Sequence, residues 1–153
     1  GYLHIVHPYL LKEYRHRWYL IGLNDDIKQI RTYGLDRILG VTTCSSIDYH
    51  DAGFDPEEYF KSTIGISGTY LEPEEIILKF TKFQSKYVIT QPIHESQEII
   101  KETESHVLVK LYVSPSYELI SRILGWGVEV EVIEPDGLRA KVKSIIEEMG
   151  NLY

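Results

Sequence analysis

The residues of this sequence that could recognise a ligand gather near its start, where arginines alternate with aromatic side chains. The arginine guanidinium makes planar, bidentate contacts with phosphate or carboxylate groups. An aromatic ring gives a nucleic-acid base a stacking surface worth about 1–3 kcal/mol per base. The candidate ligand-binding residues are Tyr9, Arg17, Trp18, Tyr19, Arg31, Tyr33, Asp36 and Arg37. Together these types of residue predict a binding site for phosphates and bases.

A structural interpretation competes with this one. Trp18 and Leu20 would then pack inside the fold, and Arg37 would pair with Asp36 or with another carboxylate. Arginines and tyrosines serve both purposes, so a single residue does not decide between them. We favour the ligand site for the cluster as a whole.

Catalytic patterns are missing from the chain. The glycine-containing run at residues 65–68 lacks the lysine and the glycine spacing of a phosphate loop. His4 and His7 lie three positions apart, which puts them on opposite faces of a strand and argues against a shared metal. Asp48, His50 and Asp51 could in principle hold a cation, but a solvated loop is the simpler interpretation. We therefore predict no enzymatic activity, no cofactor and no metal.

The elements that must position the candidate residues are short β-strands. Bulky and β-branched side chains in residues 1–50 favour a pleated sheet, and polar breaks at residues 15–16 and 24–26 are short enough for hairpin turns. Two successive hairpins predict an antiparallel sheet whose edges need closure or a partner.

Three segments in this part, residues 7–11, 17–22 and 31–38, resemble a WYL domain. They correspond to a Pro-Tyr strand, the Trp-Tyr-Leu strand itself (Trp18, Tyr19, Leu20) and a Leu-Asp-Arg-Ile strand. The resemblance implies an SH3/Sm-like β-barrel, here incomplete because its first strand is missing. It also implies a bacterial transcriptional regulator that senses single-stranded nucleic acid or a nucleotide-like effector. In such proteins DNA is bound by an N-terminal helix-turn-helix domain, which this sequence does not include.

The second half has different periodicities. A capping pattern at Asp55-Pro56 predicts a short helix ending near residue 61 or 62, and glycines then mark an extended connector. From residue 73 the pattern predicts the order β-α-β-β-α-β-α, which is ferredoxin-like with an added helix. The expected strands include residues 93–103, 105–113 and one holding Val128, Val130 and Val132. Residues 124–135 resemble the WCX extension that follows many WYL domains.

Composition bounds the remaining possibilities. The chain has 153 residues and a net charge of −7. Residues 1–50 carry six basic and five acidic side chains, whereas residues 51–153 carry ten basic and eighteen acidic ones. The single cysteine, Cys44, favours a reducing cytoplasm and a small core or strand position. No apolar run approaches the roughly 20 residues of a membrane span.

We therefore expect an α+β protein: residues 1–50 form the partial WYL-like barrel, 51–72 a helix and connector, and 73–153 a WCX-like ferredoxin-like domain. The first functional hypothesis is the ligand-sensing and dimerising C-terminal portion of a cytoplasmic transcriptional regulator, acting as a homodimer. The second is a protein–protein oligomerisation module with no small ligand. An accessory domain of an enzyme is the third and weakest.

Overall fold

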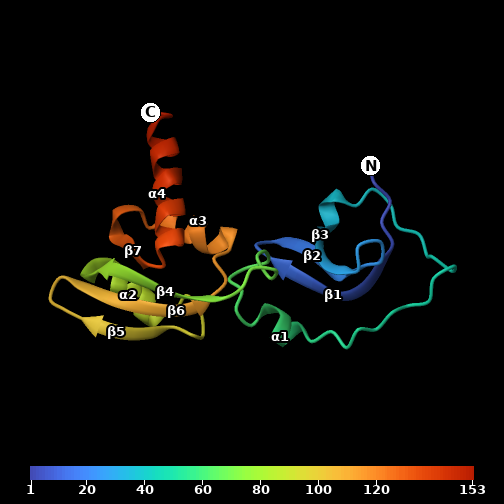
Figure 1. Cartoon of the computed structure of the whole chain (residues 1–153), viewed down its shortest axis with the longest axis horizontal. Helices are drawn as coiled ribbons and strands as arrows, with labels where there is room; N and C mark the ends of the chain where they lie inside the picture. Colours follow the sequence, from blue (N-terminus) through green and yellow to red (C-terminus); the bar gives the residue numbers. More distant parts are fainter. The chain divides into compact units, whose positions relative to one another are not determined.

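The chain forms two compact units, Gly1–Lys61 and Ser62–Tyr153 (Figure 1). The computed structural model describes all residues from 1 to 153. Each unit contains one antiparallel sheet, so the protein belongs to the mixed α+β class. None of its helices is both long and apolar enough to cross a membrane. The domain limits at residues 50 and 73 stay a prediction.

The first unit is built on a three-stranded sheet in the order β1-β2-β3. Its elements are β1 (Val6–Tyr14), β2 (Arg17–Asn24), β3 (Gln29–Gly34), the 3-10 helix η1 (Leu35–Arg37) and α1 (Pro56–Phe60). The predicted hairpin turn is Arg15-His16, where both residues have positive φ, 50° and 62°, as in the type I′ turns that match strand twist. The three strands form an open sheet rather than a closed barrel, and the SH3/Sm-like character of the incomplete barrel expected from the sequence stays a prediction.

Two local expectations in this unit are wrong. Residues 35–38 do not form a strand, because the Ile38 N–H bonds back to the Leu35 carbonyl at 3.2 Å and closes a 3-10 turn. Cys44 is neither a core nor a strand residue. It is exposed in an irregular segment, with its Sγ 3.3 Å from the Ser46 hydroxyl.

The short helix α1 begins as the capping pattern predicts. The Asp55 carboxylate accepts hydrogen bonds from the Glu57 and Glu58 N–H groups, and Pro56 occupies the first position. Just before it, the Phe54 ring stacks on Tyr9 with 5.3 Å between ring centroids. The segment leading into α1 therefore lies against β1.

The second unit contains a four-stranded sheet in the order β5-β6-β4-β7. Its elements are β4 (Glu74–Thr81), α2 (Lys82–Thr90), β5 (Glu98–Glu102), β6 (His106–Val113), α3 (Tyr117–Gly125), η2 (Gly127–Glu129), β7 (Val130–Glu134) and α4 (Asp136–Gly150). Alternate residues of β6 point into the core, as the period-two pattern predicts. These residues are Val107, Val109, Leu111 and Val113, all fully buried. Side chains of α2, α3 and α4 join the same core, so the helices cover one face of the sheet.

Two predicted strands in this unit are shorter than expected. Residues 93–97 stay outside β5, and there the Gln97 side chain accepts a hydrogen bond from the Ile93 N–H at 2.9 Å. Val128 lies in η2 rather than in β7, because the chain leaves α3 through Gly127 at φ 57° and the Glu129 N–H bonds to the Trp126 carbonyl. A tight turn thus replaces the first residues of the expected strand.

The connector at the start of the second unit is held by a buried carboxylate. Glu118, in the first turn of α3, is 6% exposed and has no cationic partner. Its Oε1 accepts the N–H groups of Ile66 and Ser67, and its Oε2 accepts the Ser67 hydroxyl at 2.5 Å. Three donors satisfy the charge, which is what a buried carboxylate requires.

Candidate functional site

The two faces of the β1-β2-β3 sheet differ in exposure. Successive residues of a strand point to opposite faces. Ile21 is fully buried on one face, which we call the Ile21 face. Trp18, on the other face, is 52% exposed. We name this second surface the Trp18 face; its apolar, aromatic and cationic members are Leu11, Trp18, Leu20, Arg31 and Tyr33, and the acidic Glu13 lies opposite Trp18.

The strand register brings these five side chains together. Leu20 lies between Leu11 of β1 and Tyr33 of β3, and Arg31 lies opposite Gly22. Trp18 is then the diagonal neighbour of Tyr33, within the roughly 7–8 Å that aromatic side chains can span. Two rings and a guanidinium therefore share one open surface, which suits the stacking of planar groups.

Polar contacts hold the ends of the Trp18 face. The Tyr33 hydroxyl accepts a hydrogen bond from Asn24 at 2.9 Å, and the His4 ring lies 6.2 Å from the Tyr33 ring. The Arg31 guanidinium donates to the Gln29 side chain at 3.0 Å. That bond occupies one of five guanidinium donors and fixes the direction of the side chain.

Three other candidate residues gather near the start of β2. Arg17 and Tyr19 alternate with Trp18 and so point to the Ile21 face. The turn of η1 brings Asp36 to Arg17, with 3.5 Å between Nη1 and Oδ2, and both side chains are more than half exposed. Such an open pair is worth little in free energy, so an anionic ligand can displace Asp36 from Arg17. Arg37 lies beside Asp36 in η1.

Tyr9 has a structural environment. It sits at an irregularity of β1 between Pro8 and Leu10, and its hydroxyl donates to the His50 carbonyl at 3.0 Å. Burial is the main cause that raises the pKa of the Tyr9 hydroxyl. The ring contacts Tyr49 and Phe54. The eight candidate residues thus divide into the Trp18 face, the Arg17 group and the partly buried Tyr9.

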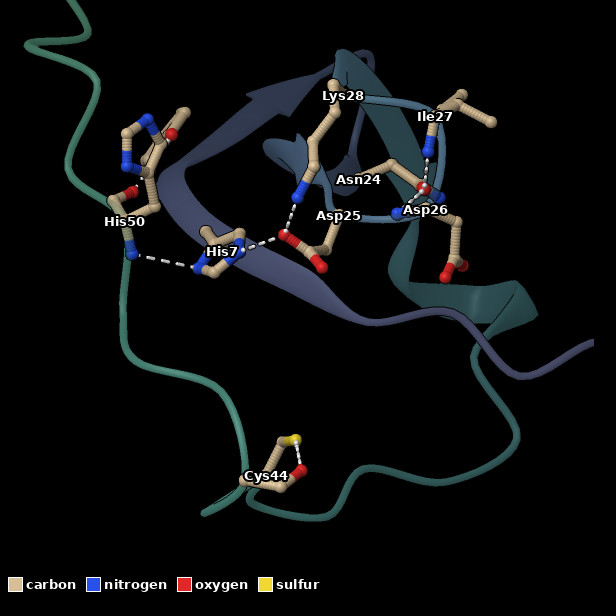
Figure 2. A network of polar contacts seen from close by, with 10 residues as sticks. His7, Asn24, Asp25, Asp26, Ile27, Lys28, Cys44 and His50 are labelled. Atoms are coloured by element: carbon tan, nitrogen blue, oxygen red, sulfur yellow. Dashed lines mark hydrogen bonds and ion pairs between the residues drawn. The ribbon is translucent and has the colours of Figure 1, made fainter.

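A polar network that was not anticipated from the sequence lies beside Tyr9. Figure 2 shows His7 between Asp25 and the backbone of His50. The His50 N–H donates to His7 Nδ1 at 3.0 Å, so the ring proton sits on Nε2 and faces Asp25 Oδ1 at 3.1 Å. Hydrogen bonds from Lys28, then from His7, lower the pKa of Asp25. The network ties the segment around residue 50 to the sheet.

A hollow of about 460 Å³ opens over this network. Its lining residues are His7, Leu23, Asp25, Lys28, Asp48, His50 and Ala52. Both ring nitrogens of His7 are engaged, and no group of three or more His, Cys, Asp or Glu side chains is arranged to hold a metal ion. Asp48, His50 and Asp51 are accordingly not arranged as a metal-binding group, and their assignment to a solvated loop stays a prediction.

The alternation of side chains along β2 is the sequence signal that could have assigned the candidate residues to the two faces of the sheet. Consecutive strand residues cannot share a face, so Trp18 and its neighbours Arg17 and Tyr19 could have been divided from the sequence. The His7 network gave no such signal, because it joins residues 18 and 43 positions apart.

Family models match two parts of the chain: the WYL domain at residues 3–43 and the WCX domain at residues 72–150. The WCX match alone covers more than half of the chain, and all eight candidate residues lie within the WYL match. The chain belongs to the family of proteins that join a WYL domain to a WCX domain.

Several solved structures are similar to this chain, including the following two. One is described as a CRISPR Cas-related protein and has a TM-score of 0.58 at 12% identity, over 97% of this chain and 43% of that one. The other is proteasome accessory factor B/C (PafBC) of Arthrobacter aurescens, with a TM-score of 0.40 at 18% identity, over 91% of this chain and 21% of that one. The chain therefore spans less than half the length of either protein. No curated protein sequence matches it.

Proposed function

We propose that this chain is the ligand-sensing and dimerising portion of a bacterial transcriptional regulator, with a nucleic-acid or nucleotide-like effector. Membership of the WYL and WCX family supports the regulatory assignment. The observation that carries the ligand class is the Trp18 face, where the exposed Trp18 and Arg31 share one side of the sheet with the half-buried Tyr33. We also propose that a helix-turn-helix domain binds DNA in this regulator, that the regulator is cytoplasmic, and that it has no catalytic activity.

In this proposal the aromatic candidate residues stack on bases and the arginines contact phosphates. Trp18 and Tyr33 offer faces to bases, and Arg31 lies beside them to meet a phosphate. Arg17 and Arg37 extend the cationic surface toward η1. A short single strand fits this arrangement better than a duplex, because its unstacked bases are open to aromatic side chains.

The fold supports two finer assignments within this proposal. The strand order β5-β6-β4-β7, with helices on one face, is that of a ferredoxin-like sheet with α4 added. The three strands of the first unit would then be part of an SH3/Sm-like barrel.

A short single-stranded oligonucleotide tests the ligand. In a Trp126→Phe background Trp18 is the only tryptophan, so we expect its fluorescence to be quenched on binding. The affinity should fall with salt at a log-log slope of about −0.7 per phosphate neutralised, which is about −2 for Arg17, Arg31 and Arg37 together. Trp18→Ala should weaken binding and leave the slope nearly unchanged.

The matched substitutions are Arg31→Ala and Lys141→Ala. The first should flatten the salt slope by about one contact, or ~0.7. The second removes an exposed cation from α4 and should leave both slope and affinity unchanged. Both the chain and the longer regulator that this proposal assumes are measured, because the lack of a neighbouring domain can by itself abolish binding. Salt-independent binding, or no binding by either protein, would refute the nucleic-acid effector.

The second candidate function is a protein–protein oligomerisation module with no small ligand. Leu11, which is 57% exposed beside Trp18, favours it because an aliphatic side chain gives a protein partner apolar contact but offers a base no ring to stack on. Leu11→Ala distinguishes the two functions. It should leave oligonucleotide affinity nearly unchanged if Trp18 and Tyr33 stack bases, and it should weaken capture of a protein partner if the face is a protein interface.

A further inference from the structure

A large groove in the second unit has no occupant within the chain. It lies between α3, η2, β7 and α4 and encloses about 670 Å³. Its apolar lining residues are Ile123, Leu124, Val128, Val130, Val132, Val142, Ile146 and Met149. It belongs wholly to the second unit and is separate from the Trp18 face.

The apolar stripe of α4 continues beyond the core. Leu138 and Val142 are 4% and 7% exposed against the sheet and α3. Ile146 and Met149 occupy the next positions of the same stripe, yet they are 54% and 48% exposed. Figure 1 shows α4 extending past the sheet toward the C-terminus, where no other element of the unit covers it. The apolar stripe of α4 thus extends beyond the part of the helix that packs against the core.

The turn η2 presents a valine at the other side of the groove. Gly127 has φ 57°, a conformation that glycine adopts readily, and the turn leaves Val128 93% exposed. An exposed knob beside an apolar hollow is the arrangement that two copies of one surface need to interlock about a two-fold axis.

The charges around the groove identify the kind of partner. Its rim carries Glu131 and Arg139, 2.9 Å apart, and Lys143 and Glu147, 3.8 Å apart. Two cations therefore balance two carboxylates here, whereas the chain as a whole has a net charge of −7. Acidic copies repel each other over most of their surface, and they meet with the least repulsion at a neutral face.

We infer that this groove is a self-association surface on which a second copy of the chain docks about a two-fold axis. Val128 of each copy enters the groove of the other, and the α4 helices run antiparallel. Lys143 and Glu147, both more than half exposed and loosely paired, then exchange partners with the second copy. This inference gives a location to the dimer interface of the proposed function. It rests on that proposed function only for the existence of a dimer.

Sedimentation of the whole chain over a concentration series tests the interface. We expect a dimer whose dissociation constant rises at least about tenfold in Val128→Asp, since each dimer buries this side chain twice. Val41→Asp is the matched control. Val41 is 84% exposed in the first unit, and its substitution should leave association unchanged. Lys143→Glu and Glu147→Lys should each weaken the dimer, and the double variant should restore it.

Three outcomes would overturn the inference. The first is a monomer at concentrations up to about 100 μM, which corresponds to no affinity of use to a stable dimer. The second is an equal effect of Val128→Asp and Val41→Asp. The third is a monomer that binds 1-anilinonaphthalene-8-sulfonate in a Val128-dependent way, which would assign the groove to a small apolar ligand. A dimer that Val128→Asp and Val41→Asp affect equally would overturn this interface alone, whereas a monomer would also overturn the dimerising role in the proposed function. Neither result depends on oligonucleotide binding, so the ligand proposal is judged separately.

Discussion

At the scale of single residues, several charged side chains of this protein form ion pairs on the surface, and the contacts of Glu131 are among those that shift a pKa. Glu131 accepts hydrogen bonds from Lys79 at 3.0 Å and from Arg139 at 2.9 Å. The Lys79 bond is the larger cause, and with the Arg139 bond it lowers the pKa of Glu131 below its ordinary value. The carboxylate thus links β4, β7 and α4 electrostatically.

The pH dependence of unfolding follows from this shift. A lowered pKa in the folded state stabilises the protein above the ordinary value of about 4.5, and that contribution is lost as the pH falls through the folded value. We expect Glu131→Gln to reduce the free energy of unfolding near neutral pH and to flatten its fall below pH ~4.5. Urea unfolding at several pH values measures both, and the effect is modest because the side chain is 43% exposed.

Glu104→Gln is the control for this prediction. Glu104 is exposed in the turn between β5 and β6, away from Lys79 and Arg139. Its substitution should leave the pH profile of unfolding in place. If both variants give the wild-type profile, the contacts of Glu131 carry no linkage to folding.

At the scale of elements, features set by a few neighbouring residues could be predicted from the sequence, whereas features set by contacts between distant residues could not. Asp55 caps α1 as expected, because a cap involves only the next few residues. The alternation of apolar residues likewise predicted which side chains of β6 point into the core, because it too depends only on neighbouring residues. The 3-10 turn at Leu35–Arg37 and the exposure of Val128 were missed, because alternating apolar residues suggested strands there and do not reveal a backbone turn that interrupts them.

The candidate site shows the same division. The sequence placed Trp18, Arg31 and Tyr33 on neighbouring strands, and the register puts them on one face. It also grouped them with Arg17 and Tyr19, which point to the other face. The groove of the second unit could not be anticipated, because it depends on where α4 ends relative to β7. Such hollows arise from packing between elements that lie apart in the sequence.

The connector provides a prediction at this scale. Gly68 has φ 84°, and a Cβ there would lie 2.7 Å from the Cβ of Ser116 at the start of α3. Gly68→Ala should therefore destabilise the second unit by about 1 kcal/mol or more, through backbone strain and overlap together. Thermal unfolding of the chain measures the change.

Gly40→Ala controls for the general cost of replacing a glycine. No atom lies within 4 Å of the position that its Cβ would take, and its φ is not positive. We expect a change within about 0.5 kcal/mol. Equal losses in the two variants would mean that the close approach to Ser116 carries no energetic cost.

At the scale of the whole molecule, buried apolar side chains are distributed very unequally. Ile21 is the one fully buried hydrophobic residue of the first unit, whereas the second unit contains a continuous core from Ile64 to Val142. Hydrophobic burial is the main source of folding free energy, so the second unit should be the more stable.

Amide hydrogen exchange in increasing urea measures this difference. We expect residues 1–61 to lose protection at lower urea concentrations than residues 62–153, in two separate transitions. Adding a ligand that binds the Trp18 face should raise the first transition and leave the second unchanged. A single transition shared by all amides would show that the two units unfold together.

The hydrogen bonds between Glu118 and the connector determine where this domain can be cut when it is transferred to another protein. The WCX match begins at residue 72, but the backbone donors of Ile66 and Ser67 that satisfy this carboxylate lie before it. A graft cut at residue 72 would lose all three hydrogen-bond donors of this carboxylate, whereas one cut before Ser62 would keep them. The portable module is therefore longer than the segment that the WCX match covers.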